Sequence, residues 1–138
     1  MHRIPCPEVI ALYRVSGIAR DVVHYHPLPG QTLRQLFKDM DDEEAVQLRR
    51  QLGAFVARLH LLGIYFRSLH LGNIVCTPSG ALGLIDLADI RITRRSLNWH
   101  QRPRNLKHML RYPEEAEWLN RTGDFLEAYR AALSTQEY

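Results

Sequence analysis

The chain has 138 residues and a mass of 16.1 kDa, which is room for one domain. Hydrophobic residues make up 46% and charged residues 24%, which excludes a disordered or fibrous chain. The net charge of +3 permits an anionic partner without requiring one. No stretch reaches the ~18 apolar residues of a membrane span, and residues 1–5 lack a secretion signal, so we expect a cytoplasmic protein.

The first half of the chain predicts strands followed by helices. Residues 9–26 contain β-branched and aromatic residues around a glycine, which predicts two short strands. Two prolines and a glycine then break regular structure, and Thr32 is a candidate cap for a short helix. Apolar residues at three- and four-residue steps predict a long helix over 43–62, capped by Asp41 or Asp42 and ended by Gly63.

The second half predicts a hairpin and a helical tail. Residues 74–77 and 81–85 read as strands joined by a turn, and a two-residue loop would place Asn73 directly opposite Asp86. Helices follow at about 104–110 and 116–132, the latter interrupted near 122–123. The fold class is therefore α+β, mostly helical, with one or two small β-hairpins.

The segment Arg-Ser-Leu-His-Leu-Gly-Asn at 67–73, followed by the hairpin and by Leu-Ile-Asp-Leu at 84–87, closely resembles the C-terminal lobe of the protein-kinase-like superfamily. Within it the chain is most similar to the lipopolysaccharide kinase (Kdo/WaaP) family. The resemblance implies a single domain over 1–138, with a remnant of the N-terminal lobe at 1–26, a hinge-like segment at 27–33 and the C-lobe at 34–138.

The resemblance also implies the site residues. His26 and Leu28 lie in the hinge-like segment, where the adenine of ATP would bind. Asn73 and Asp86 match the metal ligands, and their oxygens suit magnesium because phosphoryl transfer needs a hard divalent cation. ATP and magnesium are the implied cofactors, although binding of nucleotide also depends on an N-lobe.

The catalytic positions depart from the family pattern. Arg67 is expected to be partly buried beside the catalytic position, where Ser68 replaces the family's Asp. A serine hydroxyl does not titrate near neutral pH, so it cannot act as that carboxylate. His70 is the nearest titratable substitute, and the other interpretation is a loop histidine bonded to backbone. Asp89 is a further candidate and equally fits a surface or capping role.

Two further requirements of a kinase are missing from the sequence. No G-x-G-x-x-G pattern occurs, and no lysine precedes the hinge-like segment. We therefore expect a truncated or separately supplied N-lobe, and little or no phosphotransfer by this chain alone.

A basic segment follows the hairpin. Its cations are Arg91, Arg94, Arg95, Arg102, Arg104, Lys107 and Arg111. They fit binding of a phosphorylated glycolipid, an acidic partner or nucleic acid. They equally fit a solvated helix face that pairs with the acids of 41–44 or 114–117. Trp99 and Trp118 are expected to anchor packing.

Two functions follow from these observations. The first is a protein of the lipopolysaccharide core sugar kinase type that is degenerate or incomplete in this chain. The second is a non-catalytic, pseudokinase-like module that recognises an envelope component or a protein partner through its basic segment. Nucleic acid is a weaker third candidate, and we do not expect it as the partner. Peripheral attachment to the inner membrane is compatible with both leading functions.

Overall fold

The computed structural model describes residues 30–78, 80–85 and 90–136, and the expected strands within 9–26 lie outside them. The short N-terminal elements are β1 (Gln31–Thr32), α1 (Leu33–Leu36) and the 3-10 turn η3 (Phe37–Asp39). The central elements are α2 (Asp42–Leu61), β2 (Ile64–Phe66), η4 (Leu71–Asn73), β3 (Ile74–Cys76), β4 (Leu82–Leu84) and β5 (Ile90–Ile92). The tail consists of α3 (Gln101–Met109), α4 (Pro113–Asn120) and α5 (Asp124–Gln136).

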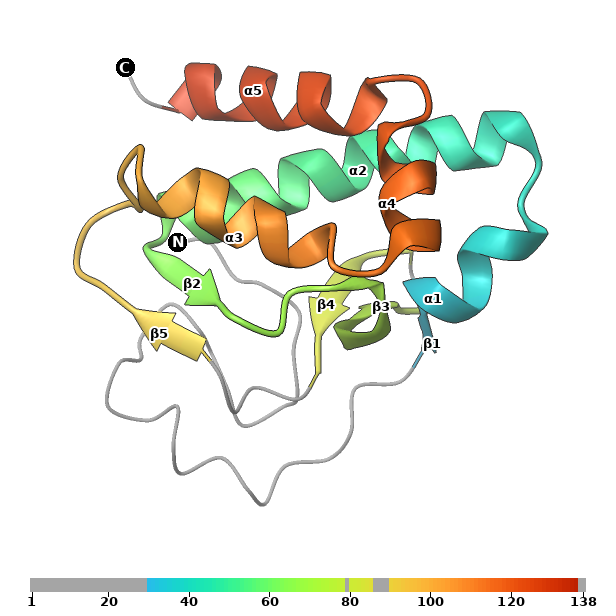
Figure 1. The fold of residues 1–138 in the computed structure, drawn as a ribbon, viewed down its shortest axis with the longest axis horizontal. Coiled ribbons are helices and arrows are strands. Elements are labelled where there is room, and N and C mark those ends of the chain that lie inside the picture. Colours follow the sequence, from blue (N-terminus) through green and yellow to red (C-terminus); the bar gives the residue numbers. More distant parts are fainter. Residues whose placement is uncertain (1–29, 79, 86–89, 137–138) are drawn as a thin grey trace.

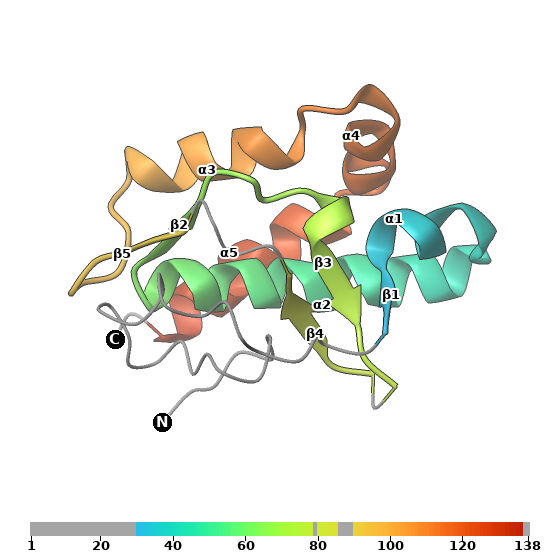
Figure 2. The same cartoon turned by 90° about the horizontal axis from the view of Figure 1, so that it is seen from below.

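The long helix α2 is the centre of the fold. Helix α5 runs along one side of it, and the small sheets lie on the opposite side (Figures 1 and 2). Gly53 of α2 allows this close approach, since a Cβ there would meet the carbonyl oxygen of Phe125 at 2.3 Å. Leu52, Val56 and Leu59 are fully buried around it. The packed α2–α5 pair thus supports the small sheets and the loops that connect their strands.

Local sequence signals account for the bounds of α2. The Asp41 carboxylate accepts from the Glu44 N–H while the Glu44 side chain accepts from the Asp41 N–H, which completes a capping box. Gly63 ends the helix with φ +80°, a backbone conformation that is unfavourable for residues with a Cβ atom. Its carbonyl then accepts from the Thr93 N–H at 2.9 Å. The predicted helix, its acidic cap and its glycine stop are confirmed.

Two small antiparallel sheets flank α2. One has the strand order β1-β3-β4, and the other pairs β2 with β5. The second sheet was not predicted, because each strand has only three residues and its partner lies about 26 positions away in sequence. The result is a mostly helical α+β fold, as the sequence predicts.

The predicted register of the β3–β4 hairpin is wrong by one residue. Ile74 pairs with Leu84 and Cys76 with Leu82, and the Ile85 N–H donates to the Asn73 carbonyl. Asn73 therefore lies opposite Ile85 rather than Asp86. The physical reason is the turn, because Gly80 adopts φ +89° and the loop holds three residues, where the prediction assumed two. Asp86 itself lies outside the described residues.

The tryptophans behave differently from each other. Trp118 is buried and meets Phe37 edge-on at 5.6 Å between ring centroids, so its anchoring role is confirmed. Trp99 is 74% exposed and stacks on His100, so the same prediction for Trp99 is wrong. Trp99 precedes α3 in an irregular segment, and no core element covers it there.

Among the described helices, none is long and apolar enough to cross a membrane.

Candidate functional site

The loop that joins β2 to β3 carries the predicted catalytic residues. Leu69 and Leu71 are fully buried and fasten the loop to the core. The polar residues Arg67, Ser68 and His70 alternate with these anchors. The apolar spacing therefore positions the polar side chains in a fixed order along the loop.

Asn73 closes this loop. Its side chain is largely buried, and its amide NH₂ donates to the Ser68 carbonyl at 2.8 Å. The same nitrogen lies 3.2 Å from His70 Nε2. This bond joins Asn73 to the backbone of Ser68, the position that the resemblance assigns to the catalytic group, and this contact was not predicted from the sequence.

His70 is engaged at both ring nitrogens. Its Nδ1 accepts from the Gly72 N–H at 3.1 Å and lies 3.2 Å from the Arg34 guanidinium. Both neighbours can only donate, so Nδ1 is the acceptor in these contacts. The lone pair that a general base would use is therefore occupied. The contacts are those of a loop histidine bonded to backbone.

A partly buried ion pair, which was not predicted from the sequence, holds the loop from outside. The Arg34 Nε on α1 donates to Glu115 on α4, and Glu115 is only 4% exposed. The other Glu115 oxygen accepts from the Leu71 N–H at 3.3 Å. The bond to Glu115 raises the pKa of Arg34 above its ordinary value. No sequence signal joins two residues 81 positions apart.

We expect Glu115→Ala to destabilise the protein by about 2 kcal/mol, since it leaves the buried Leu71 N–H and the Arg34 guanidinium without their acceptor. Urea unfolding followed by circular dichroism measures this loss. The control is Glu117→Ala on the same helix, which removes an exposed pair with Arg121 and should cost no more than about 0.5 kcal/mol. Equal losses in the two variants would contradict the clamping role of Glu115.

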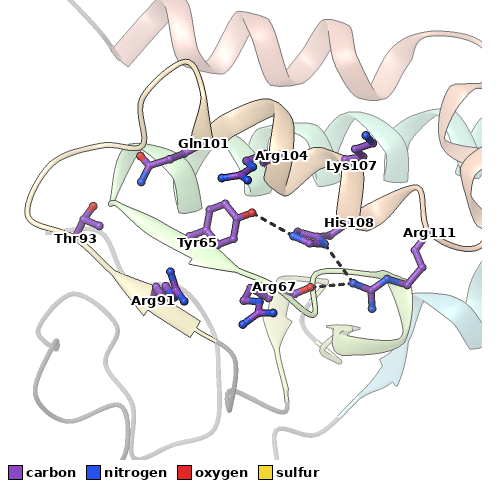
Figure 3. Close-up of a pocket in the computed structure, with 9 residues that line it drawn as sticks. All are labelled: Tyr65, Arg67, Arg91, Thr93, Gln101, Arg104, Lys107, His108 and Arg111. Carbon is purple, nitrogen blue, oxygen red and sulfur yellow. Dashed lines mark hydrogen bonds between the residues drawn. The ribbon is translucent and has the colours of Figure 1, made fainter.

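A basic groove lies between α3 and the β2–β5 sheet (Figure 3). It has a volume of about 600 Å³. The residues lining this basic groove are Tyr65, Arg67, Arg91, Thr93, Gln101, Arg104, Lys107, His108 and Arg111. Part of the predicted basic segment therefore converges with the loop residue Arg67 on one cavity.

Arg67 departs from its prediction. It was expected to be partly buried, and it is exposed at the edge of the basic groove. The reason is its place directly after β2, where its neighbours Phe66 and Leu69 occupy the core and Arg67 faces away from it. Arg111 donates to the Arg67 backbone carbonyl at 3.3 Å, so the loop and the end of α3 are joined.

The comparisons identify the family. The model of the lipopolysaccharide kinase (Kdo/WaaP) family matches residues 24–129, which is more than half of the chain. The chain belongs to the lipopolysaccharide kinase (Kdo/WaaP) family. A solved structure described as "WaaP in complex with acyl carrier protein" is similar in fold, with a TM-score of 0.55 and 12% identity. The match covers 82% of this chain and 60% of that one. No curated protein matches the chain significantly.

The Kdo/WaaP membership bears on the predicted magnesium site. The Asn73 amide nitrogen is turned to Ser68, so the side-chain oxygen is the atom that remains for a hard cation. Together with an Asp86 carboxylate it would be a donor set that suits magnesium, which would neutralise phosphate charge when bound. Asp86 and the hinge-like residues His26 and Leu28 lie outside the described residues, so their roles stay predictions. Within the described ranges no cluster of three or more His, Cys, Asp or Glu side chains could hold a metal.

Proposed function

We propose that this chain is a lipopolysaccharide core sugar kinase-like protein whose catalytic loop does not support phosphotransfer. The family supplies the substrate class. The observation that carries the proposal is the loop itself, which is closed by the Asn73–Ser68 bond while the position of the catalytic carboxylate holds a serine. His70 does not replace that carboxylate, because its Nδ1 lone pair is committed to Gly72 and Arg34.

The loss of the general base lowers the rate of phosphotransfer by a factor that can be stated. A positioned general base contributes about 10² to 10⁴ in rate, and misaligned phosphates lower the rate further. Asn73 and Asp86 would then hold magnesium and nucleotide weakly, without turnover. The sequence also contains no G-x-G-x-x-G pattern to position phosphates.

The expected result is no transfer of labelled γ-phosphate from ATP to lipopolysaccharide core acceptors or to the protein itself. Wild type and Asp86→Ala should both stay at the background of the assay. Calorimetry with ATP and magnesium then tests whether the cause is weak nucleotide binding or the missing base. Heat of binding without phosphate transfer would assign the lack of activity to the missing base. Robust transfer by wild type that disappears in Asp86→Ala would overturn the proposal. His70 would then be the first residue to test.

The basic groove favours a second candidate function, a non-catalytic module that recognises an envelope component or a protein partner. Its cations lie beside the catalytic loop and are joined to it through Arg111 and Arg67. The WaaP structure in complex with acyl carrier protein supports a protein as one class of partner. Either function places the chain in the cytoplasm, at the inner membrane when its ligand is carried by a lipid.

A further inference from the structure

The basic groove carries positive charge that no described side chain compensates. Among its described lining residues there is no carboxylate. The nearby acids of α4 are committed elsewhere, because Glu114 pairs with Lys38, Glu115 with Arg34, and Glu117 with Arg121. Of the ion pairs within the described ranges, none includes a cation of the basic groove. The alternative that these cations pair with the acids of 41–44 or 114–117 is therefore not what the structure shows.

Backbone periodicity explains why the cations face one cavity. Tyr65 and Arg91 are direct partners across the β2–β5 pair, so their side chains lie on the same face of that sheet. Arg67 and Thr93 follow two residues later and share that face. Along and just past α3, lining residues recur at three- and four-residue steps and form one stripe of the helix. The stripe consists of Gln101, Arg104, Lys107, His108 and Arg111.

Hydrogen bonds hold part of this surface in place. The Tyr65 hydroxyl lies 3.2 Å from His108 Nε2, and Arg111 lies 3.2 Å from His108 Nδ1 (Figure 3). Burial and the positive charges of Arg111, Arg67 and Arg104 lower the pKa of His108.

We propose that the basic groove is a binding site for a small polyol or sugar that carries two or more phosphate groups. Arginine forks match phosphate oxygens in pairs, and cations stand on both walls, so a single phosphate would leave most of them unpaired. The volume of about 600 Å³ exceeds what one phosphate fills and lies in the range of small-molecule sites. Tyr65, Thr93 and Gln101 are neutral hydrogen-bonding groups that pair with hydroxyls.

This site adjoins the loop closed by Asn73 through Arg67, and it deepens the second candidate function by naming the chemistry of its ligand. It rests on that binding function and is independent of phosphotransfer. The same chemistry occurs in a soluble sugar phosphate and in a phosphorylated lipid head group. The experiment therefore has one arm for each source.

Calorimetry on the full chain compares three probes: inorganic phosphate, fructose 1,6-bisphosphate and inositol hexakisphosphate. We expect the two multiply phosphorylated probes to bind at least about tenfold more tightly than phosphate. Arg91→Gln/Arg104→Gln should weaken their binding by about tenfold or more, and Lys107→Gln by less. All three side chains are exposed, so the variants should fold, and thermal unfolding verifies it. Sedimentation with vesicles containing phosphatidylinositol bisphosphate is the lipid arm.

The matched control is Arg130→Gln, an exposed arginine of α5 outside the basic groove. It should bind every probe as wild type does. Equal weakening by Arg130→Gln, equal affinity for phosphate and the multiply phosphorylated probes, or no binding would each overturn the proposal. The proposal would also be overturned if a single-stranded oligonucleotide bound more tightly than any probe and its binding were abolished in the double variant. The groove would then bind nucleic acid. If the chain binds none of the phosphorylated probes but does bind a protein partner, the proposed ligand is rejected and the binding function is kept.

Discussion

Gly53→Ala is expected to destabilise the protein by about 2 to 3 kcal/mol. The added Cβ would lie 2.3 Å from the Phe125 carbonyl oxygen and 2.9 Å from the Tyr129 backbone nitrogen. Both are backbone atoms of α5, so the helix must move away from α2 to relieve the contact. Movement of α5 also loosens the buried residues packed between the two helices.

The sign of this effect makes the test decisive. Alanine is a better helix former than glycine by about 1 kcal/mol, so helix propensity alone predicts that Gly53→Ala stabilises the protein. Urea unfolding of wild type and Gly53→Ala measures whether the gain in helix propensity or the steric contact with α5 is larger. Gln47→Ala, an exposed change on the same helix, should stay within about 0.5 kcal/mol of wild type. A gain in stability for Gly53→Ala would show that α2 and α5 are not packed this closely.

The free energy of unfolding is expected to fall by roughly 3 kcal/mol between pH 7 and pH 4 through His60. This side chain is completely buried, with Nδ1 2.7 Å from the Tyr129 hydroxyl and Nε2 3.0 Å from Asn105 Oδ1. The Asn105 amide nitrogen donates to the Phe66 carbonyl, so its oxygen faces the ring. His60 therefore donates from Nε2 and accepts at Nδ1, which is a fully satisfied neutral imidazole.

Burial is the main cause that lowers the pKa of His60 to about 4 from its ordinary 6.5. Between these values the unfolded chain binds a proton that the folded chain does not, so stability is fully present above pH 6.5 and is lost as the pH falls toward 4. Each pKa unit corresponds to about 1.36 kcal/mol, which predicts a loss of about 2 kcal/mol by pH 5.

Urea unfolding at several pH values between 7 and 5 measures this slope. His60→Gln removes the titrating ring, so its slope should be flat over that range, whatever its stability at pH 7. His100→Gln changes an exposed histidine and should keep the slope of wild type. A wild-type slope in His60→Gln would assign the pH dependence to other groups.

The sequence by itself determined the elements that depend on neighbours along the chain. The bounds of α2 follow from its Asp41 cap, its apolar period and the stop at Gly63. Thr32 caps α1 as predicted, with a capping box to Gln35. The break between α4 and α5 also lies where the sequence predicts it, since Gly123 adopts φ +80° there. These signals act over one or two helical turns, so a single sequence contains them in full.

Part of the candidate site was equally local. The motif at 67–73 led to the Kdo/WaaP family, whereas the bond from Asn73 to the Ser68 backbone came only from the structure. The basic segment was visible as a run of charges. Its meaning was not, because a run in sequence does not say which charges share a cavity.

Only the tertiary structure decided the contacts between distant segments. The hairpin register moved by one residue because a three-residue turn replaced the assumed two. The Arg34–Glu115 clamp and the β2–β5 sheet join residues that no local pattern relates. The same pairing exposed Arg67 and brought it to the basic groove. Burial, register and charge compensation depend on which surfaces meet, and that is set by packing of the whole chain rather than by propensity at any one position.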